Sequence, residues 1–181
     1  MTTIVAVKDE TGGVTFGWDS QSTSGHHKKL SVSEKVFRNG SVVLGVSGAV
    51  RASNLIEFMD VPEVDSYRPG FDSRAWAITG FIPELRRTLK NGGVVDSDAY
   101  EYWNGSAVLA VEGEIYRIGP DFAVMKAEDG IIAIGSGGDL AEAALRNGAS
   151  VEEAVRQATQ RDVYSGGEIH VKTVEGFFSD E

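Results

Sequence analysis

The sequence predicts a layered α+β domain in which two β-sheets are covered by helices on each outer side. Three observations favour this class. Apolar strand patterns come in hairpin pairs, helical patterns come in two pairs, and strands and helices do not alternate one by one. A chain of 181 residues is long enough to bury one apolar core. We therefore expect a single domain over residues 1–181.

Two β-hairpins are predicted near the start of the chain. In each, two runs rich in β-branched residues flank a glycine-containing turn, and the second turn is Asn39-Gly40, a dipeptide typical of tight hairpins. We expect the polar stretch between the hairpins, residues 20–33, to be a flexible loop. The four predicted strands are 3–7, 14–18, 35–38 and 41–46.

After the second hairpin the period of the apolar residues changes, which indicates helices. The first helix is expected over 50–59 and is followed by a loop over 60–72. Ser73 is the predicted N-cap of a second helix, 74–90. Pro83 should kink or split that helix, because proline has no amide hydrogen for the helical ladder.

The second half of the chain follows the same order, with a hairpin and a strand before a pair of helices. The third hairpin turns at Gly113, and the glycine-rich turn 135–138 leads from a short apolar strand into a helix. Ser150 and Glu153 form a capping box at the start of the last helix. The predicted strands are 106–111, 114–118, 131–134 and 168–174, and the helices are 139–146 and 151–158.

The composition excludes several classes of function. There are 17 Lys and Arg against 27 Asp and Glu, and a net charge of -10 argues against a nucleic-acid or anionic-membrane partner. Cysteine is absent, which removes disulfides, thiolate metal sites and Cys nucleophiles. No targeting segment or long apolar run is visible in the sequence. We therefore expect a cytoplasmic protein that uses no metal and no other cofactor.

Three patterns in the sequence could carry chemistry, and each has a simpler structural interpretation. The turn Gly135-Ser136-Gly137-Gly138 lacks the third glycine of a dinucleotide site and the lysine of a P-loop, so a tight turn is favoured. His26 and His27 lack the spacing of a metal site on a helix. Residues 162–167 read as the loop that ends a helix. No Ser-His-Asp triad can be assembled from three isolated histidines.

The start of the chain offers a nucleophile of a different kind. Aminopeptidases remove an initiator Met before a small residue, which would leave Thr2 with a free α-amine. The pKa of such an amine is about 7.7–8.0, so at neutral pH it can act as general base to the hydroxyl of the same residue. Many proteins begin with Met-Thr, so this feature does not decide the function alone.

Taken in order, these segments resemble the proteasome β-subunit superfamily, which includes the HslV-type peptidases. Those proteins are N-terminal-nucleophile hydrolases with a four-layer α-β-β-α sandwich, and the match runs along nearly the whole chain. The matching segments are Thr2-Thr3-Ile4-Val5, Gly17-Trp18-Asp19 with Gly25, Lys35-Val36, residues 44–49, residues 133–138 and residues 161–167 with Ile169 and Val171.

The resemblance implies a threonine-type endopeptidase. Thr2 would attack the scissile carbonyl and form an acyl-enzyme, and Asp19 would hold the Lys35 cation that lowers the pKa of the Thr2 hydroxyl. The Gly45 amide would donate a hydrogen bond to the developing oxyanion. Ser136, Asp162 and Ser165 are expected around the α-amine, and Ser22, Val46, Ser47 and Gly48 are expected to bind substrate.

The resemblance also implies a self-compartmentalised homo-oligomer, a stack of hexamer or heptamer rings that cleaves unfolded polypeptides. It allows for an ATP-dependent unfoldase that feeds the chamber. Two alternatives stay open: an N-terminal-nucleophile amidase that acts on a small amide, and a catalytically silent ring or assembly protein of the same fold. The turn 9–13 looks longer than in the family and the segment 35–45 shorter than in HslV, but both changes fall in turns.

Overall fold

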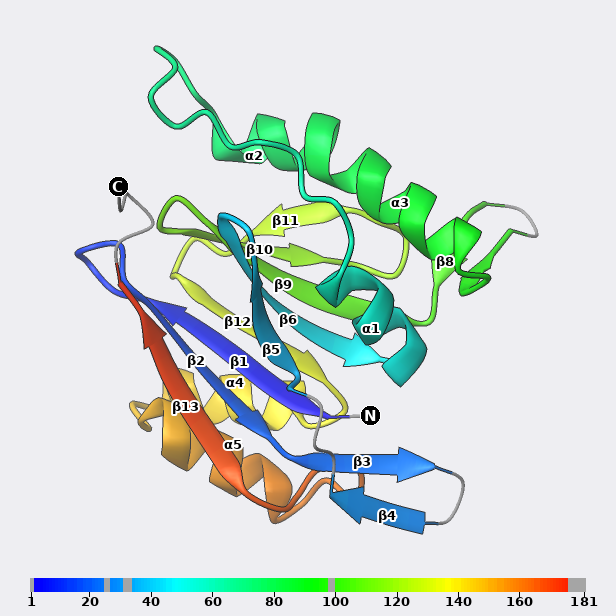
Figure 1. Cartoon of the computed structure of the whole chain (residues 1–181). Coiled ribbons are helices and arrows are strands. Elements are labelled where there is room, and N and C mark those ends of the chain that lie inside the picture. Colours follow the sequence, from blue (N-terminus) through cyan, green and yellow to red (C-terminus); the bar gives the residue numbers. More distant parts are fainter. Residues whose placement is uncertain (1, 25–26, 31–33, 98–99, 176–181) are drawn as a thin grey trace.

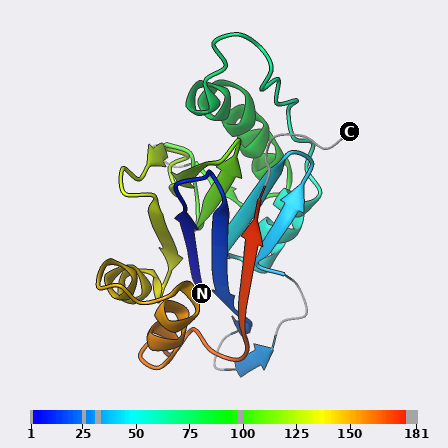
Figure 2. The ribbon, with the colours of Figure 1, turned by 90° about the vertical axis from the view of Figure 1, so that its left-hand side faces the viewer.

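A computed structural model describes residues 2–24, 27–30, 34–97 and 100–175. Two antiparallel sheets pack face to face, and helices cover the outer side of each sheet (Figure 1). In the side view of Figure 2, the green helical segment lies near the top and the yellow and orange helices lie near the bottom of the molecule. The predicted four-layer α-β-β-α sandwich is confirmed.

The first sheet holds the start of the chain in its interior. Its strand order is β12-β1-β2-β13, and Thr3 at the beginning of β1 pairs with Gly135 at the end of β12. Ile4 pairs with Trp18 of β2, so the last residue of β2, Asp19, lies beside the start of β1. The strands are β1 (Thr3–Lys8), β2 (Val14–Asp19), β12 (Ile131–Gly135) and β13 (Ile169–Val174).

The second sheet contains the other two predicted hairpins. Its order is β11-β10-β9-β6-β5, and all neighbours are antiparallel. The strands are β5 (Val36–Asn39), β6 (Val42–Gly48), β9 (Gly105–Val111), β10 (Glu114–Ile118) and β11 (Val124–Lys126). The range 20–33 is expected as a flexible loop, but its described residues include two paired strands, β3 (Gln21–Ser24) and β4 (His27–Leu30).

Three apolar layers hold the sheets and helices together. Phe16, Val108 and Ile134 belong to the layer between the two sheets. Leu85 belongs to the layer between the second sheet and its helices, and Ala154 to the layer under the other helix pair. The helices are α1 (Val50–Glu57), α2 (Ser73–Trp76), α3 (Ile82–Asn91), α4 (Gly138–Arg146) and α5 (Val151–Thr159).

The helix ends follow the sequence with one correction. Ser150 caps α5 through a 3.2 Å hydrogen bond from the Glu153 amide, as predicted. Ser73 is not the cap of α2, because the Asp72 carboxylate accepts from the Arg74 and Ala75 amides one residue earlier. The break expected from Pro83 is present: a π-helical turn, η1 (Ala77–Phe81), separates α2 from α3.

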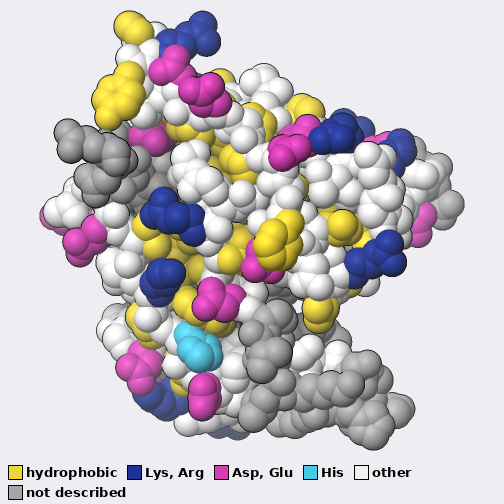
Figure 3. Space-filling view, in the orientation of Figure 1, with side chains coloured by type: hydrophobic (Ala, Val, Ile, Leu, Met, Phe, Trp, Pro, Cys, Tyr) yellow, Lys and Arg dark blue, Asp and Glu magenta, His cyan; other side chains and the backbone are white. Residues whose placement is uncertain are grey.

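Other features of the sequence lie at the margins of these layers. The short strands β7 (Val95–Asp96) and β8 (Tyr102–Trp103) were not predicted, because two residues carry no alternating pattern. His26 lies outside the described residues. On the face shown in Figure 3, charged side chains of both signs are interspersed and form no continuous basic surface. No helix in the described ranges is long and apolar enough to cross a membrane.

The layer beneath α3 should carry a large share of the stability. Leu85 is fully buried there, so Leu85→Ala should lower the free energy of unfolding by about 2–5 kcal/mol. Leu140 on α4 is 44% exposed, so Leu140→Ala is the matched control and should change stability by about 0.5 kcal/mol or less. Denaturant unfolding of both variants tests this, and equal losses would contradict the layer assignment.

Candidate active site

The Thr2 hydroxyl lies at one end of the two central strands of the first sheet, where β1 begins and β2 ends. Thr2 is 3% exposed, and its Oγ1 donates a 2.6 Å hydrogen bond to Asp19 Oδ1. The Thr3 amide donates to the same carboxylate oxygen at 2.9 Å. The pairing of β1 with β2 therefore brings Thr2, the predicted nucleophile, into contact with Asp19, the predicted acidic residue.

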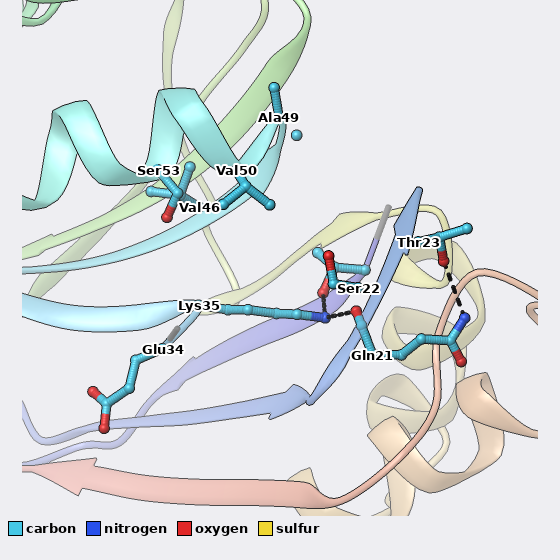
Figure 4. Close-up of a pocket in the computed structure, with 11 residues that line it drawn as sticks. Gln21, Ser22, Thr23, Glu34, Lys35, Val46, Ala49, Val50 and Ser53 are labelled. Atoms are coloured by element: carbon cyan, nitrogen blue, oxygen red, sulfur yellow. Dashed lines mark hydrogen bonds between the residues drawn. The ribbon is translucent and has the colours of Figure 1, made fainter. Parts of the chain in front are cut away.

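Lys35 reaches the same point from the second sheet. It precedes β5, and its Nζ donates to Asp19 Oδ1 at 2.7 Å and to the Gln21 carbonyl at 2.7 Å. The same Nζ also donates to Thr2 Oγ1. Figure 4 shows the Lys35 side chain reaching toward Gln21. The Thr2 hydroxyl, the Asp19 carboxylate and the Lys35 ammonium are thus hydrogen-bonded to one another where the two sheets meet.

The Asp19 carboxylate is fully buried, and its second oxygen is also occupied. Asp19 Oδ2 accepts from the Gln21 amide at 3.1 Å and from the Gly166 amide at 2.8 Å. A buried charge is tolerated only when it is paired and hydrogen-bonded, and here both conditions are met. Asp19 is therefore a fixed anion against which the other groups are aligned.

Burial also changes the acidity of the ammonium. Desolvation lowers the pKa of Lys35, while the charge and hydrogen bond of Asp19 oppose this effect without cancelling it. The pKa of Lys35 therefore lies below its ordinary value. Lys35 therefore loses its proton at a lower pH than an exposed lysine does. A reaction that needs the charged form of Lys35 should slow at that pH.

A second hydrogen-bonded group joins three predicted site residues. Asp162 Oδ2 accepts from Ser136 Oγ and from Ser165 Oγ, each at 2.6 Å. Burial raises the pKa of Asp162, but hydrogen bonds from both hydroxyls and the Tyr164 amide outweigh it and leave that pKa below its ordinary value. Ser136 Oγ lies 3.5 Å from the Thr2 carbonyl oxygen, so this group is next to the start of β1.

The glycines of the turn 135–138 allow this close approach. Gly135 has a φ of +90°, and a Cβ there would lie 2.0 Å from the Thr2 carbonyl oxygen. At Gly137 a Cβ would lie 2.0 Å from Thr3 Oγ1. The turn is therefore filled by the first residues of β1, which favours the tight-turn interpretation over a phosphate-binding one.

A pocket of about 130 Å³ opens beside the Thr2 hydroxyl. One wall comes from the β3 segment and is polar, and the opposite wall comes from the end of β6 and the first turns of α1 (Figure 4). Three predicted binding residues, Ser22, Val46 and Gly48, line it. The other lining residues are Thr2, Gln21, Thr23, Glu34, Lys35, Ala49, Val50 and Ser53.

Two predicted residues, Gly45 and Ser47, neither line this pocket nor belong to the two hydrogen-bonded groups. Gly45 is paired with Val36 of β5 on one side and Val108 of β9 on the other, and a Cβ there would lie 3.0 Å from the Ile4 side chain. Its amide lies inside the sheet, so it cannot serve as the predicted oxyanion donor. Ser47 is 6% exposed and does not line the pocket.

Other residues of the site were missed in the sequence. Gln21 and Thr3 are buried polar residues whose amides donate to the Asp19 carboxylate. Both lie close in sequence to a predicted site residue: Thr3 follows Thr2, and Gln21 lies two residues after Asp19. Ala49, Val50 and Ser53 line the pocket because α1 begins directly after β6. Within the described ranges, no group of three or more His, Cys, Asp and Glu side chains could hold a metal ion.

Comparison with curated proteins supports the resemblance. The chain is 29% identical over 194 residues to the protein named ATP-dependent protease subunit HslV of Wolbachia sp. subsp. Brugia malayi (strain TRS). The match covers 97% of this chain and 98% of that protein. No family model matches the chain.

Solved structures give the same result for the fold. The eukaryotic HslV from Trypanosoma brucei is 28% identical with a TM-score of 0.65, over 96% of this chain and 99% of that one. Thiobacillus denitrificans BPH has a TM-score of 0.72 at 21% identity, over 96% and 98% of the two chains. BPH in complex with epoxomicin has the same TM-score at 19% identity. The chain therefore has the fold of HslV-type and proteasome-type peptidases.

The close packing at the turn yields a prediction with an internal control. Gly135 and Gly148 have nearly equal φ values, +90° and +88°, but a Cβ at Gly148 meets nothing within 4 Å. Gly148→Ala should cost about 1–2 kcal/mol from the backbone alone. Gly135→Ala should cost about 1–3 kcal/mol more, because the new Cβ displaces Thr2. Equal unfolding free energies for the two variants would show that Thr2 does not depend on this turn.

Proposed function

We propose that this chain is a threonine-type peptidase of the proteasome-like kind, with Thr2 as its N-terminal nucleophile after removal of Met1. The observation that carries the proposal is the hydrogen-bonded set of the Thr2 hydroxyl, the Asp19 carboxylate and the Lys35 ammonium. Similarity to an HslV protease subunit along 97% of the chain supports it.

The chemistry follows from this arrangement. The free α-amine of Thr2 takes the proton of its own hydroxyl as Oγ1 attacks the scissile carbonyl carbon. The Lys35 cation, held by Asp19, stabilises the developing alkoxide by its charge. The carbon–nitrogen bond then breaks, the leaving amine takes the proton from the α-ammonium, and an ester to Thr2 remains. Water attacks that ester with the α-amine again as base, which releases the product acid and restores the hydroxyl.

The oxyanion donor in this proposal is the amide of Gly48 in place of that of Gly45. The Val46 amide donates to the Lys35 carbonyl at 2.9 Å, and amides two residues apart on a strand point to the same side. The Gly48 amide therefore points past the end of β5, on the side of Lys35. Gly48 has a φ of +142° and lines the pocket, so it suits a turn at which a backbone amide faces a ligand.

Ser136, Asp162 and Ser165 orient the α-amine in this proposal. The low pKa of Asp162 keeps its carboxylate charged at neutral pH, so it can accept a hydrogen bond from an ammonium as well as from the two hydroxyls. The contact of Ser136 Oγ with the Thr2 carbonyl places the group on the backbone side of the nucleophile. In this proposal Asp19 holds the Thr2 hydroxyl and Asp162 orients the Thr2 α-amine, so each group has its own carboxylate.

The wider assembly is proposed by analogy with the relatives. The curated relative is named a subunit of an ATP-dependent protease, so we assign unfolded polypeptides as substrates and an ATP-dependent unfoldase as partner. A homo-oligomeric stack of hexamer or heptamer rings would enclose the sites. The proposed substrates, unfoldase partner and ring assembly all depend on the peptidase assignment, and an experiment that contradicts it would contradict them too.

Intact-mass measurement after incubation with a peptide epoxyketone tests the assignment. That probe needs a hydroxyl and a free amine on one residue, so the wild-type chain should lose Met and gain one adduct at Thr2. Thr2→Ala should gain none, while Thr173→Ala, which removes an exposed hydroxyl on β13, should react as wild type.

Other outcomes would contradict the assignment in different ways. A native chain that retains Met and stays unmodified would favour the silent ring or assembly protein. Adduct formation together with faster turnover of a small amide than of any peptide would favour the amidase. Peptide cleavage by Thr2→Ala at the wild-type rate would exclude Thr2 as the nucleophile.

A further inference from the structure

Gln21 is a buried polar residue at the site to which the proposed mechanism gives no role. In the described part of the chain the buried polar or charged side chains are Thr2, Thr3, Asp19, Gln21, Ser47 and Ser165. Gln21 is 2% exposed, and burying a primary amide costs free energy unless its hydrogens find acceptors. Its contacts therefore show what the residue holds together.

The side chain of Gln21 uses both of its amide hydrogens. Nε2 donates to the Val163 carbonyl at 3.2 Å. It also donates to Thr23 Oγ1 at 3.2 Å (Figure 4). Val163 belongs to the loop that carries Asp162 and Ser165, and its side chain is 71% exposed. The Val163 carbonyl is thus hydrogen-bonded to the buried Gln21 amide, although the Val163 side chain faces solvent.

The backbone of Gln21 contacts the other half of the site. Its carbonyl accepts from Lys35 Nζ at 2.7 Å, and its amide donates to Asp19 Oδ2 at 3.1 Å. The same amide donates to the Gly166 carbonyl at 2.8 Å. Gln21 therefore contacts both Asp19 and Lys35, which act on the Thr2 hydroxyl, and the 162–166 loop, which is assigned to the α-amine.

We propose that Gln21 is a positioning residue that holds the Lys35 ammonium in register with the 162–166 loop through its buried side-chain amide. The inference rests on the proposed function, because it assigns the two halves of the site to the hydroxyl and the amine of Thr2. Gln21 acts through its neighbours and does not touch the reacting atoms. Its loss should slow the chemical step more than it weakens substrate binding, since small displacements of reacting groups cost up to about 100-fold in rate.

Gln21→Met tests the inference, because it keeps the length of the side chain and removes both donors. The matched control is Gln157→Met, whose amide donates to Glu153 Oε1 at 3.1 Å on the exposed face of α5. With a fluorogenic peptide and a peptide epoxyketone, Gln21→Met should lower kcat and the inactivation rate constant about 10-fold or more. Gln21 and Thr23 line the pocket, so KM and the inhibitor's initial binding constant can change too, but they should change less than kcat and the inactivation rate constant do. Gln157→Met should match wild type.

Gln21→Glu is the second variant and keeps the test valid if Gln21→Met fails to fold. A carboxylate cannot donate to the Val163 carbonyl, whereas a protonated carboxyl can donate one hydrogen bond. The rate of Gln21→Glu relative to wild type should therefore rise as the pH falls. A flat ratio would overturn the inference.

The outcomes separate this inference from the proposed function. A wild-type chain that reacts at Thr2 and a Gln21→Met chain that reacts equally fast would overturn the positioning role alone. A loss confined to thermal stability, or one that appears in KM and not in kcat, would do the same. A wild-type chain that never reacts at Thr2 would overturn the proposed function and this inference with it.

Discussion

The arrangement of the site depends on one buried carboxylate. Asp19 is fully buried, and its two oxygens accept from the Thr2 hydroxyl, the Lys35 ammonium and the Thr3, Gln21 and Gly166 amides. An isolated buried charge would be strongly unfavourable, and the five donors that converge on this carboxylate offset that cost. The same constraint that stabilises the carboxylate also brings the nucleophile and the cation within hydrogen-bonding distance of each other.

The four-layer fold supplies these donors from distant parts of the sequence. The first sheet brings together β1, β2 and the end of β12, and the second sheet contributes Lys35 from the start of β5. Gly135 then allows the β12–α4 turn to approach the backbone of Thr2. The site lies where the two sheets meet, which explains why one residue, Gln21, can contact both halves of it.

Much of this could be predicted from local sequence patterns, but not all of it. Hairpin turns, the Ser150 cap and the break at Pro83 depend on neighbouring residues, and all of them are present. The choice between Gly45 and Gly48 depends on which strand pairs on each side of β6, and short-range patterns do not contain that information. For the same reason the paired strands within residues 20–33 and the contacts of the Gln21 side chain were missed.

The central claim is that Asp19 holds a protonated Lys35 against the Thr2 hydroxyl. Burial already lowers the pKa of Lys35, and the Asp19 anion partly restores it by favouring the charged form. The decisive measurement is the pH dependence of epoxyketone addition to Thr2 in wild type and in Asp19→Asn. Without the anion the pKa of Lys35 should fall further, so the loss of reactivity at alkaline pH should move to lower pH. An alkaline limb that stays in place or moves to higher pH would contradict the account.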